Sequence, residues 1–466
     1  MERIGIFVVS YGARCAAIAH TLFKSQNYKI DLYIADKQRN PLNAQIGKVH
    51  QVIPDLDVQK LCQFANKYRE AIDFGIVGAE GPIIDGLRDL VEKKAMIPII
   101  CPIKDLAIEK SKVEQRQLLS EIIPHANPPY KIFVPKDYPT KREIMAAAEK
   151  WITERGGAER VVIKPDKPGY GKGVGVGGEH FFTIAQATEH FRALLGENVN
   201  QKVIIEDRIE GEESSHQTWC DGKTLLSLPE TRDYKRAFDG DIGPNTGGMG
   251  SYRDVEESLP FIRKKDREIE IDITKKIFHK LTQSGNGVGL RGTPFYIAFI
   301  HTASEPKILE INSRPGDPEI MAILPSLEED FVDVCYDMVH GTLGNVKFRK
   351  ESAVVTYAVP LTYGGYREIF TGSSLVNLSS VTRLIESYKD KLQVYPGSME
   401  LKNNHTYTLK SRTIAVVGVG DSIQEAREIS LNGIRCIDGP LWNRWDIASE
   451  KHIGSCITHM NELRCR

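Results

Sequence analysis

A glycine-rich segment in the middle of the chain holds residue types that bind phosphate. Residues 164–179 read KPDKPGYGKGVGVGGE and contain six glycines, although each glycine costs about 0.5–1 kcal/mol relative to alanine inside a regular element. Such a loop, starting at Lys164 on the end of an apolar run, can fold over a nucleotide and present backbone N–H groups and Lys172 to phosphate oxygens. It is not a Walker A loop, because Asp166 and Gly173 stand where that motif needs glycine and Ser or Thr. The alternative is a flexible surface hairpin.

A second chemical pattern lies in the segment LEINSRPGDPE at 309–319. Because side chains alternate along a strand, Glu310 and Asn312 point to one side, and Arg314 continues that face. A carboxylate and an amide oxygen are hard ligands that suit Mg²⁺ held jointly with nucleotide phosphates. The arginine can clamp a phosphate or a developing anion. The alternative is an exposed edge strand with ordinary polar alternation.

A third segment, ETRDYKRAFDGDIGPNTGGMGSY at 230–252, combines charges with a glycine-rich turn. Asp233 and Lys235 stand near its start, and Asn245 lies in the turn. Long ordered loops of this kind are more often binding loops than filler. The alternative is a solvated hairpin.

Two glutamates follow the glycine-rich segment in VIIEDRIEGEES, where Glu206 ends an apolar run and Glu213 follows a tight turn. A carboxylate after such a turn can hold ribose hydroxyls, although as single residues both could be ordinary surface acids. The order of the signals is more specific than any one of them. A lysine on a strand, a glycine loop, a strand-end acid and a Glu-x-Asn pair about 100 residues later form the pattern that an ATP-grasp nucleotide site requires.

Along nearly its whole length the chain resembles the phosphoribosylamine–glycine ligases (glycinamide ribonucleotide synthetases), a family of the ATP-grasp superfamily. The most specific match is DGDIGPNTGGMGSY at 239–252, and DYKR, EINSRPGDPE and VGAEGPIIDGL fall in the family's order. KSK at 110–112 and the C-terminal segments AVPLTYGGY and VVGVGDSIQEAR are similar too. A biotin-carboxylase-type enzyme is disfavoured, because it would leave the signature at 239–252 unexplained.

The resemblance implies a reaction of de novo purine synthesis. ATP would drive the joining of glycine to 5-phosphoribosylamine through an acyl phosphate, with Mg²⁺ or Mn²⁺ as cofactor. Such chemistry asks the protein for charge neutralisation, positioning and exclusion of water. The resemblance assigns ATP to Lys112, Lys164, Lys172, Glu206, Ile209 and Glu213; metal to Glu310 and Asn312; the amine substrate and glycine to Gly12, Arg14, Glu80, Asp233, Lys235, Asn245 and Asp317; and catalysis to Arg314, Lys172 and Asp317.

The first loop departs from the family pattern, which reads roughly G-S-G-G-R-E-H-A. Here it is SYGARCAA: Gly12 and Arg14 remain, while Ala13, Cys15 and Ala16 replace glycine, glutamate and histidine. This loop follows the first strand and is expected to meet the sugar phosphate at a helix N-terminus. The alternatives are a paralogous ATP-grasp carboxylate–amine ligase with a different amine acceptor, and a catalytically inactive nucleotide-binding homologue.

The elements that would position these residues follow an α/β pattern. Apolar strands at 3–10, 30–35, 74–77 and 97–102 alternate with helical runs, which predicts an N-terminal doubly wound parallel sheet. A dinucleotide site is not expected, because no G-x-G-x-x-G follows the first strand. The chain is predicted to comprise a Rossmann-like substrate domain at 1–105, an ATP-grasp domain at 106–330 with a lid subdomain at about 128–207, and a small, mostly β C-terminal domain at 331–466.

The composition fits a small-molecule enzyme. The chain has 41% hydrophobic and 26% charged residues and a formal net charge of -1, which gives no support to a large nucleic-acid footprint. No apolar run approaches the roughly 20 residues needed to span a bilayer, and MERIGIFVVS is read as a strand rather than a signal peptide. Eight cysteines without C-x-x-C pairs are typical of reduced thiols. We therefore expect a cytoplasmic monomer or homodimer that binds neither nucleic acid nor membrane.

Overall fold

The N-terminal part of the protein is a parallel sheet with helices packed against it. The computed structural model describes residues 1–168, 173–283 and 285–465, and in it five strands pair in the order β3-β2-β1-β4-β5, every pair parallel. The near-continuous apolar strands suit this arrangement, because helices cover both faces of such a sheet. The elements are β1 Arg3–Ser10, α1 Gly12–Phe23, β2 Lys29–Asp36, α2 Pro41–Ile46, β3 Gly47–Val52, α3 Val58–Lys67, β4 Phe74–Val77, α4 Glu80–Ile84, α5 Leu87–Lys94 and β5 Ile99–Ile100.

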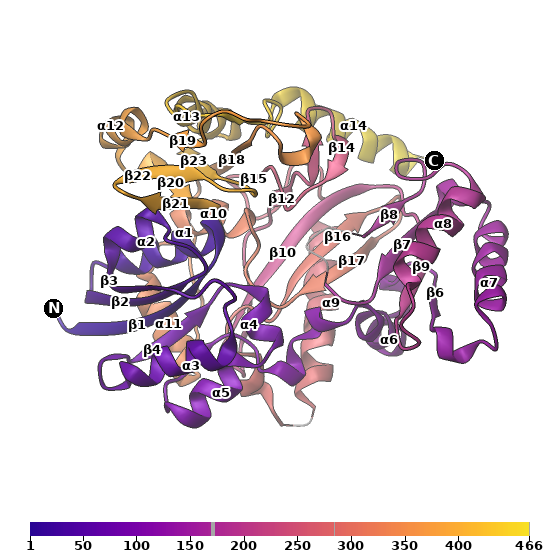
Figure 1. Cartoon of the computed structure of the whole chain (residues 1–466), viewed down its shortest axis with the longest axis horizontal. Coiled ribbons are helices and arrows are strands. Elements are labelled where there is room, and N and C mark those ends of the chain that lie inside the picture. The colour runs from indigo at the N-terminus through magenta and orange to yellow at the C-terminus, as the bar shows by residue number, and fades with distance from the viewer. Residues whose placement is uncertain (169–172, 284, 466) are drawn as a thin grey trace.

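A lid projects to one side of the molecule, at the right of Figure 1. Its antiparallel sheet has the order β6-β9-β7-β8, and two helices pack on one another and on the sheet around Phe133 and Phe191. Thr183 and Gln186 form a capping box that starts the second helix. The lid elements are β6 Tyr130–Phe133, α7 Lys141–Glu154, β7 Val161–Pro165, β8 Gly175–Val176, α8 Ile184–Leu195 and β9 Val203–Asp207.

The central sheet lies between the lid and the N-terminal part. It has the antiparallel order β11-β10-β16-β17, with Ala298 paired to Glu310 and Tyr296 to Asn312. The polar end of β17 is thereby held against a fully buried strand. The elements around it are α6 Lys112–Ile122, β10 Glu212–Cys220, β11 Leu225–Ser227, α9 Lys264–Thr282, β16 Tyr296–His301, β17 Pro306–Asn312, α10 Glu319–Ile323 and α11 Phe331–His340.

The C-terminal sheet recruits two strands from the middle of the chain. Its order is β12-β15-β18-β23-β20, with β24 paired to β18, and β12 and β15 come from residues 232–253. Helix α13 lies close because position 418 is glycine, where a β-carbon would stand 2.0 Å from the Ala426 carbonyl oxygen. The elements are β12 Arg232–Asp233, β13 Arg236–Phe238, β14 Ile242–Asn245, β15 Gly250–Arg253, β18 Ser352–Pro360, β19 Leu375–Val376, α12 Ser379–Tyr388, β20 Leu392–Pro396, β21 Met399–Lys402, β22 His405–Thr408, β23 Ile414–Gly420, α13 Ile423–Arg435, β24 Leu441–Trp442 and α14 Glu450–Cys465.

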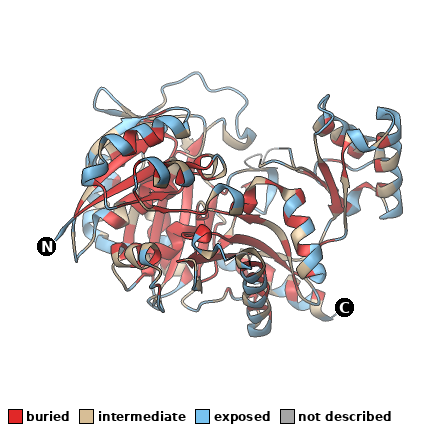
Figure 2. Ribbon diagram, turned by 90° about the horizontal axis from the view of Figure 1, so that it is seen from below, coloured by how far each residue is buried: buried red, intermediate tan, exposed pale blue. Residues whose placement is uncertain are grey.

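Burial is concentrated in the sheets, whereas the outer faces of the helices are exposed (Figure 2). The N-terminal part is joined to later residues at α11, whose N-cap Asp330 accepts a hydrogen bond from Ser25 Oγ at 2.7 Å. In the described part of the chain, no helix combines the length and the apolar character needed to cross a bilayer. The eight cysteines are free thiols.

The predicted α/β class and the N-terminal parallel sheet are confirmed. The strand expected over 97–102 is shorter, Ile99–Ile100, since the prolines at 98 and 102 cannot donate a ladder hydrogen bond. Residues 331–340, expected to open a strand-rich region, form helix α11. The divisions near 105 and 330 stay predictions.

Candidate active site

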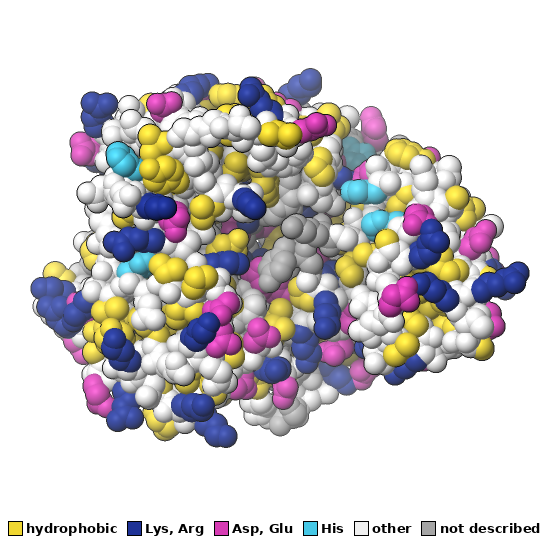
Figure 3. All heavy atoms as spheres, viewed as in Figure 1, with side chains coloured by type: hydrophobic (Ala, Val, Ile, Leu, Met, Phe, Trp, Pro, Cys, Tyr) yellow, Lys and Arg dark blue, Asp and Glu magenta, His cyan; other side chains and the backbone are white. Residues whose placement is uncertain are grey.

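The residues singled out in the sequence converge on one large cavity. It has a volume of about 970 Å³ and is lined from the N-terminal part, the lid, the central sheet and the C-terminal part. Figure 3 shows the surface hollowed at the centre of this face, beside the lid. The expected residues among its lining are Arg14, Glu80, Lys112, Lys164, Glu206, Ile209, Glu213, Asp233, Lys235, Asn245, Glu310, Asn312, Arg314 and Asp317.

The lid side of the cavity contains a buried ionic triad. Glu206, at the end of β9, pairs with Lys164 on β7 and accepts from Arg116 Nε on α6 at 2.9 Å. Lys164 Nζ also donates to the Leu309 carbonyl at 3.3 Å. Burial opposes ionisation of Glu206, but the charges of Arg116 and Lys164 outweigh it and lower the pKa of the carboxyl. This arrangement fixes the lysine in the wall of the cavity.

The end of β17 carries an ionised carboxylate surrounded by cations. Burial alone would raise the pKa of Glu310, but Lys112, Lys235 and further cations outweigh it and lower the pKa to about 2. Lys112 Nζ lies 4.0 Å from Glu310 Oε2. Asn312 Oδ1 accepts from Arg314 at 3.2 Å. A carboxylate and an amide oxygen therefore stand next to one another as candidate ligands for a hard cation.

Arg14 of the first loop, Glu80 of α4 and Glu109 contact the segment after β17. Arg14 donates to Glu80 at 3.0 Å and to the Pro315 carbonyl at 2.8 Å. Arg314 lies 3.4 Å from Glu109, with its guanidinium over the Tyr296 ring at 5.4 Å. Burial opposes ionisation of Glu80, whereas its two arginine neighbours lower its pKa to about 2. Arg14 thus links the first loop to the segment after β17 and also lines the cavity.

The C-terminal part contributes an arginine that the sequence reasoning missed. Arg412 forms an ion pair with Asp317 at 3.2 Å and donates to the Asp317 carbonyl at 2.9 Å and to the Gly248 carbonyl at 3.1 Å. Its guanidinium lies over the Tyr357 ring at 4.7 Å, and Tyr357 donates to Asp317 at 2.6 Å. Gly12 borders the same carboxylate, because a β-carbon there would stand 3.3 Å from Asp317 Oδ2.

The loop after β12 places a second set of charges on the cavity wall. Lys235 lies 3.3 Å from Glu213. Burial opposes the charged form of the lysine, but Glu213 and further acids outweigh it and raise the pKa of Lys235. Asp233 is partly buried beside them, and its buried Oδ1 finds no hydrogen-bond partner among the described residues. Asn245 sits at the end of β14 and faces the cavity.

Two family models match this chain. The N domain of phosphoribosylglycinamide synthetase matches residues 4–109, and the ATP-grasp (A) domain of the same family matches residues 131–320. The phosphoribosylamine–glycine ligase of Methanosarcina barkeri is 35% identical over 98% of this chain and 99% of its own. That of Pyrococcus furiosus is 32% identical over 99% and 98%. This chain belongs to the phosphoribosylamine–glycine ligase family.

Solved structures agree on the fold of this ligase family. The phosphoribosylamine–glycine ligase of Thermotoga maritima superposes with a TM-score of 0.74 at 22% identity, covering 95% of this chain and 100% of its own. The biotin carboxylase domain of 2-oxoglutarate carboxylase from Hydrogenobacter thermophilus, solved with MgADP, superposes with a TM-score of 0.66 at 12% identity, covering 98% and 93%. At these identities the likeness concerns the fold alone.

Two arginines that contact these residues could not be recognised from motifs. Arg116 and Arg412 carry no motif of their own, and each reaches the site from a remote segment. The signal that could have found Arg116 is its place on a helix that starts with the matched KSK, one turn after Lys112. Lys172, expected on the lid, falls outside the described residues.

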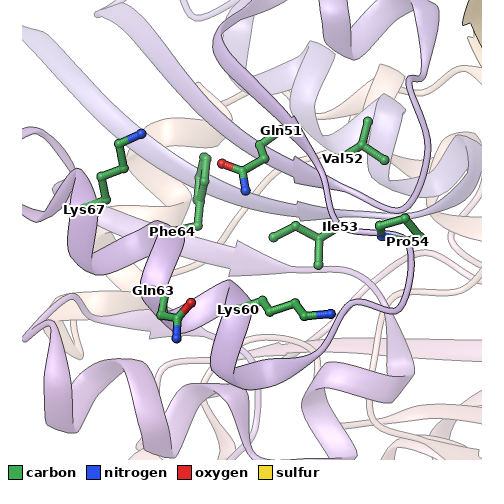
Figure 4. A pocket seen from close by; sticks show the side chains of 8 residues that line it. All are labelled: Gln51, Val52, Ile53, Pro54, Lys60, Gln63, Phe64 and Lys67. Carbon is green, nitrogen blue, oxygen red and sulfur yellow. The ribbon is translucent and has the colours of Figure 1, made fainter.

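Two other features do not take part in the family's site. A smaller pocket of about 460 Å³ (Figure 4) opens beside β3 and α3 and is lined by Lys60, Phe64 and their neighbours. A buried cluster of His216, Glu230 and Glu270 brings ligand atoms within 4.8 Å of one another. Arg267 pairs with Glu230 at 3.0 Å and also contacts His216, so a guanidinium already supplies the cation there.

Proposed function

We propose that this chain joins glycine to 5-phosphoribosylamine through an acyl phosphate, with conversion of ATP to ADP and phosphate, giving glycinamide ribonucleotide. The observation that carries this proposal is the single cavity in which the lid lysine, the Glu310–Asn312 pair and Arg314 meet the family's Asp233–Asn245 segment. The relatives that match along the whole chain bear the name of this reaction. The enzyme is thus an ATP-dependent carbon–nitrogen ligase of purine synthesis.

The nucleotide is proposed to lie between the lid and the central sheet. Lys112 and Lys164 would neutralise phosphate oxygens, and Lys172 would do so from the lid loop. The segment from Glu206 to Ile209 would contact adenine, and Glu213 would hold the ribose. When the nucleotide enters, Lys164 can exchange part of its contact with Glu206 for a phosphate, because Arg116 stays behind to compensate the carboxylate.

The metal ligands are proposed to be Glu310 and Asn312, and the residues present fit a hard divalent cation. The Glu310 carboxylate is ionised throughout the physiological pH range, since its pKa is about 2, and the neighbouring amide oxygen is a suitable second ligand. Mg²⁺ or Mn²⁺ bound with ATP would neutralise phosphate charge and align the γ-phosphate. Arg314 would stabilise the charge that develops during phosphoryl transfer.

The glycine and amine subsites are proposed to lie on the opposite wall. Asp233, Lys235, Asn245 and Asp317 would hold glycine and the amine, with Glu80 and the Gly12 and Arg14 loop at the sugar-phosphate end. Lys37, Lys410 and Arg412 also line this end of the cavity and add positive charge for a phosphate. The residue directly after β2 and the C-terminal part would thereby place cations beside the first loop.

The experiment that tests this proposal measures ADP release from purified protein with ATP, Mg²⁺ or Mn²⁺ and combinations of substrates. We expect turnover only when glycine and phosphoribosylamine are both present. The proposal would be contradicted if this pair supported only background turnover while another amine or amino acid supported turnover above background.

A variant pair tests the metal site. Glu310→Ala is expected to lower kcat by roughly 10²–10³-fold, the size seen when one transition-state charge stabiliser is removed. Glu328→Ala, an exposed acid away from the cavity, is the matched control and should keep wild-type turnover. Equal rates for Glu310→Ala and the control would show that the carboxylate does not serve catalysis.

A further inference from the structure

Glu179 joins the lid to the hairpin formed by β13 and β14. The residue lies in the turn between β8 and α8, and its Oε2 forms an ion pair with the guanidinium of Arg236 at the start of β13. Both side chains line the cavity. Among the residues that the structure describes, no other ion pair connects the lid to β13 or β14. This ion pair therefore bridges two walls of the cavity that belong to separate parts of the chain.

The carboxylate of Glu179 is held in position from the lid side by Arg208. Arg208 Nη2 donates to Glu179 Oε1 at 3.2 Å, and its Nη1 donates to the Gly177 carbonyl at 2.7 Å. Glycine at position 178 leaves room for this arginine, because a β-carbon there would stand 2.8 Å from Arg208 Nη1. Its φ of +76° also favours glycine. The lid thus presents an oriented carboxylate to its partner.

Arg236 is held on the hairpin side by contacts of its own. Its Nη1 donates to the Gly243 carbonyl at 3.0 Å, and its backbone carbonyl accepts from the buried Arg444 at 2.9 Å. In the hairpin Arg236 pairs with Asn245, one of the residues proposed to hold glycine. Because each partner of the ion pair is already ordered, little side-chain freedom is lost when the pair forms.

The same contacts connect the two proposed substrate regions. Arg208 belongs to the segment from Glu206 to Ile209 that is proposed to contact adenine. A series of contacts therefore runs from the nucleotide wall through Arg208 and Glu179 to Arg236, on the strand opposite Asn245. Closure of the lid over the nucleotide and the position of the glycine wall are thereby linked.

The ion pair is exposed enough to open and form again. The side chains of Glu179 and Arg236 are 29% and 17% exposed, whereas those of Glu206 and Arg116 in the buried triad are 2% and 3% exposed. Separating a partly exposed pair costs much less than separating a buried one. The contact between Glu179 and Arg236 is therefore the one that breaks more easily when the lid opens.

We propose that the Glu179–Arg236 ion pair is a latch that fastens the closed lid to the hairpin and keeps water from the acyl phosphate. This inference rests on the proposed function, which supplies that intermediate. Water attacking glycyl phosphate would return glycine and release inorganic phosphate and a proton, so the net reaction would be hydrolysis of ATP without ligation. Closed lids protect reactive intermediates in this way. Glu179 and Arg236 are positioning residues, since they act through the position of the lid.

The ratio of ADP to glycinamide ribonucleotide formed tests the latch, because inactive protein does not change this ratio. The wild type should form about one ADP per product, and Glu179→Gln, which removes the charge and keeps the shape, roughly two or more. Arg236→Gln should raise the ratio similarly, and the double variant should raise it no further, since both changes remove the same contact. Glu189→Gln is the matched control, because Glu189 pairs with Arg192 within α8, and it should keep the wild-type ratio.

Release of a fluorescent ATP analogue, followed by stopped flow with Mg²⁺ present, tests the latch without the amine substrate. Glu179→Gln should release the analogue roughly fivefold faster than Glu189→Gln, because loss of a partly exposed ion pair shifts the lid toward its open state by about that factor. The two variants should have the same melting temperature, since the change lies at the edge of the cavity and not in a core.

Three results would overturn the inference. They are an ADP-to-product ratio of Glu179→Gln equal to that of Glu189→Gln, equal release rates of the analogue from these two variants, and additive effects of Glu179→Gln and Arg236→Gln. Failure of the proposed function has a different signature. The wild-type protein would then form no glycinamide ribonucleotide from glycine and phosphoribosylamine, while the release rates would still show whether the latch holds the lid.

Discussion

Replacement of Arg412 by lysine tests whether the C-terminal part completes the active site. The planar, charged guanidinium of Arg412 pairs with the Asp317 side chain. It also donates to the backbone carbonyls of Asp317, Gly247 and Gly248. A lysine ammonium keeps the charge but lacks the planar set of N–H donors of a guanidinium. Loss of two charge-assisted hydrogen bonds at about 1.5 kcal/mol each amounts to about 3 kcal/mol. Since about 1.36 kcal/mol is tenfold in rate, kcat/KM for glycine should fall roughly 150-fold.

The assay is steady-state ADP release with each substrate varied in turn, and the control is Arg383→Lys on the exposed face of α12. Because Arg412 lies on the wall opposite the lid, KM for ATP should stay within about threefold of wild type. A kcat/KM for glycine in Arg412→Lys within threefold of the control would refute this role of Arg412. A rise in KM for ATP without a loss of kcat/KM for glycine would refute it as well.

Two further predictions concern the buried ion pairs. Arg116→Met removes one cation from Glu206 and should destabilise the protein by about 3–5 kcal/mol, because the carboxylate stays buried with Lys164 as its remaining cation; a urea midpoint equal to that of wild type would contradict this. Glu80 has a folded-state pKa of about 2, below the ordinary 4.5, since Arg14 and Arg314 outweigh its burial. An acid whose pKa is lowered by folding stabilises the fold above pH 4.5. That contribution, here up to about 3 kcal/mol, is lost as the pH falls toward 2. Urea midpoints measured from pH 6 to pH 3 should therefore fall more steeply for wild type than for Glu80→Gln, and parallel curves would count against it.

The features that could be predicted from the sequence are those for which a single segment carries all the information. The strand at 3–10 appears with the same bounds, because seven consecutive buried residues leave no other element that fits. Glu310 and Asn312 share a face because alternation along one strand decides it. The glycine-rich loop after Lys164 was recognised by composition, although residues 169–172 lie outside the described structure.

The rest depends on contacts between remote segments. Glu206 was expected at the adenine, and the structure adds a pairing with Arg116 and Lys164 that no spacing encodes. Arg412 reaches Asp317 across 95 residues, and its neighbours in sequence form no recognisable motif. The strands β12 and β15 join a sheet whose other members follow residue 350. Pairings of this kind are set by tertiary packing rather than by local propensity.

The most direct test of the central claim follows the carboxylate oxygens of glycine. In the proposed reaction the glycine carboxylate attacks the γ-phosphate, and the amine then displaces phosphate from the acyl phosphate. Glycine labelled with ¹⁸O in its carboxylate should therefore pass one labelled oxygen to inorganic phosphate for each glycinamide ribonucleotide formed, which mass spectrometry of both products measures. Unlabelled phosphate released together with that product would contradict the account.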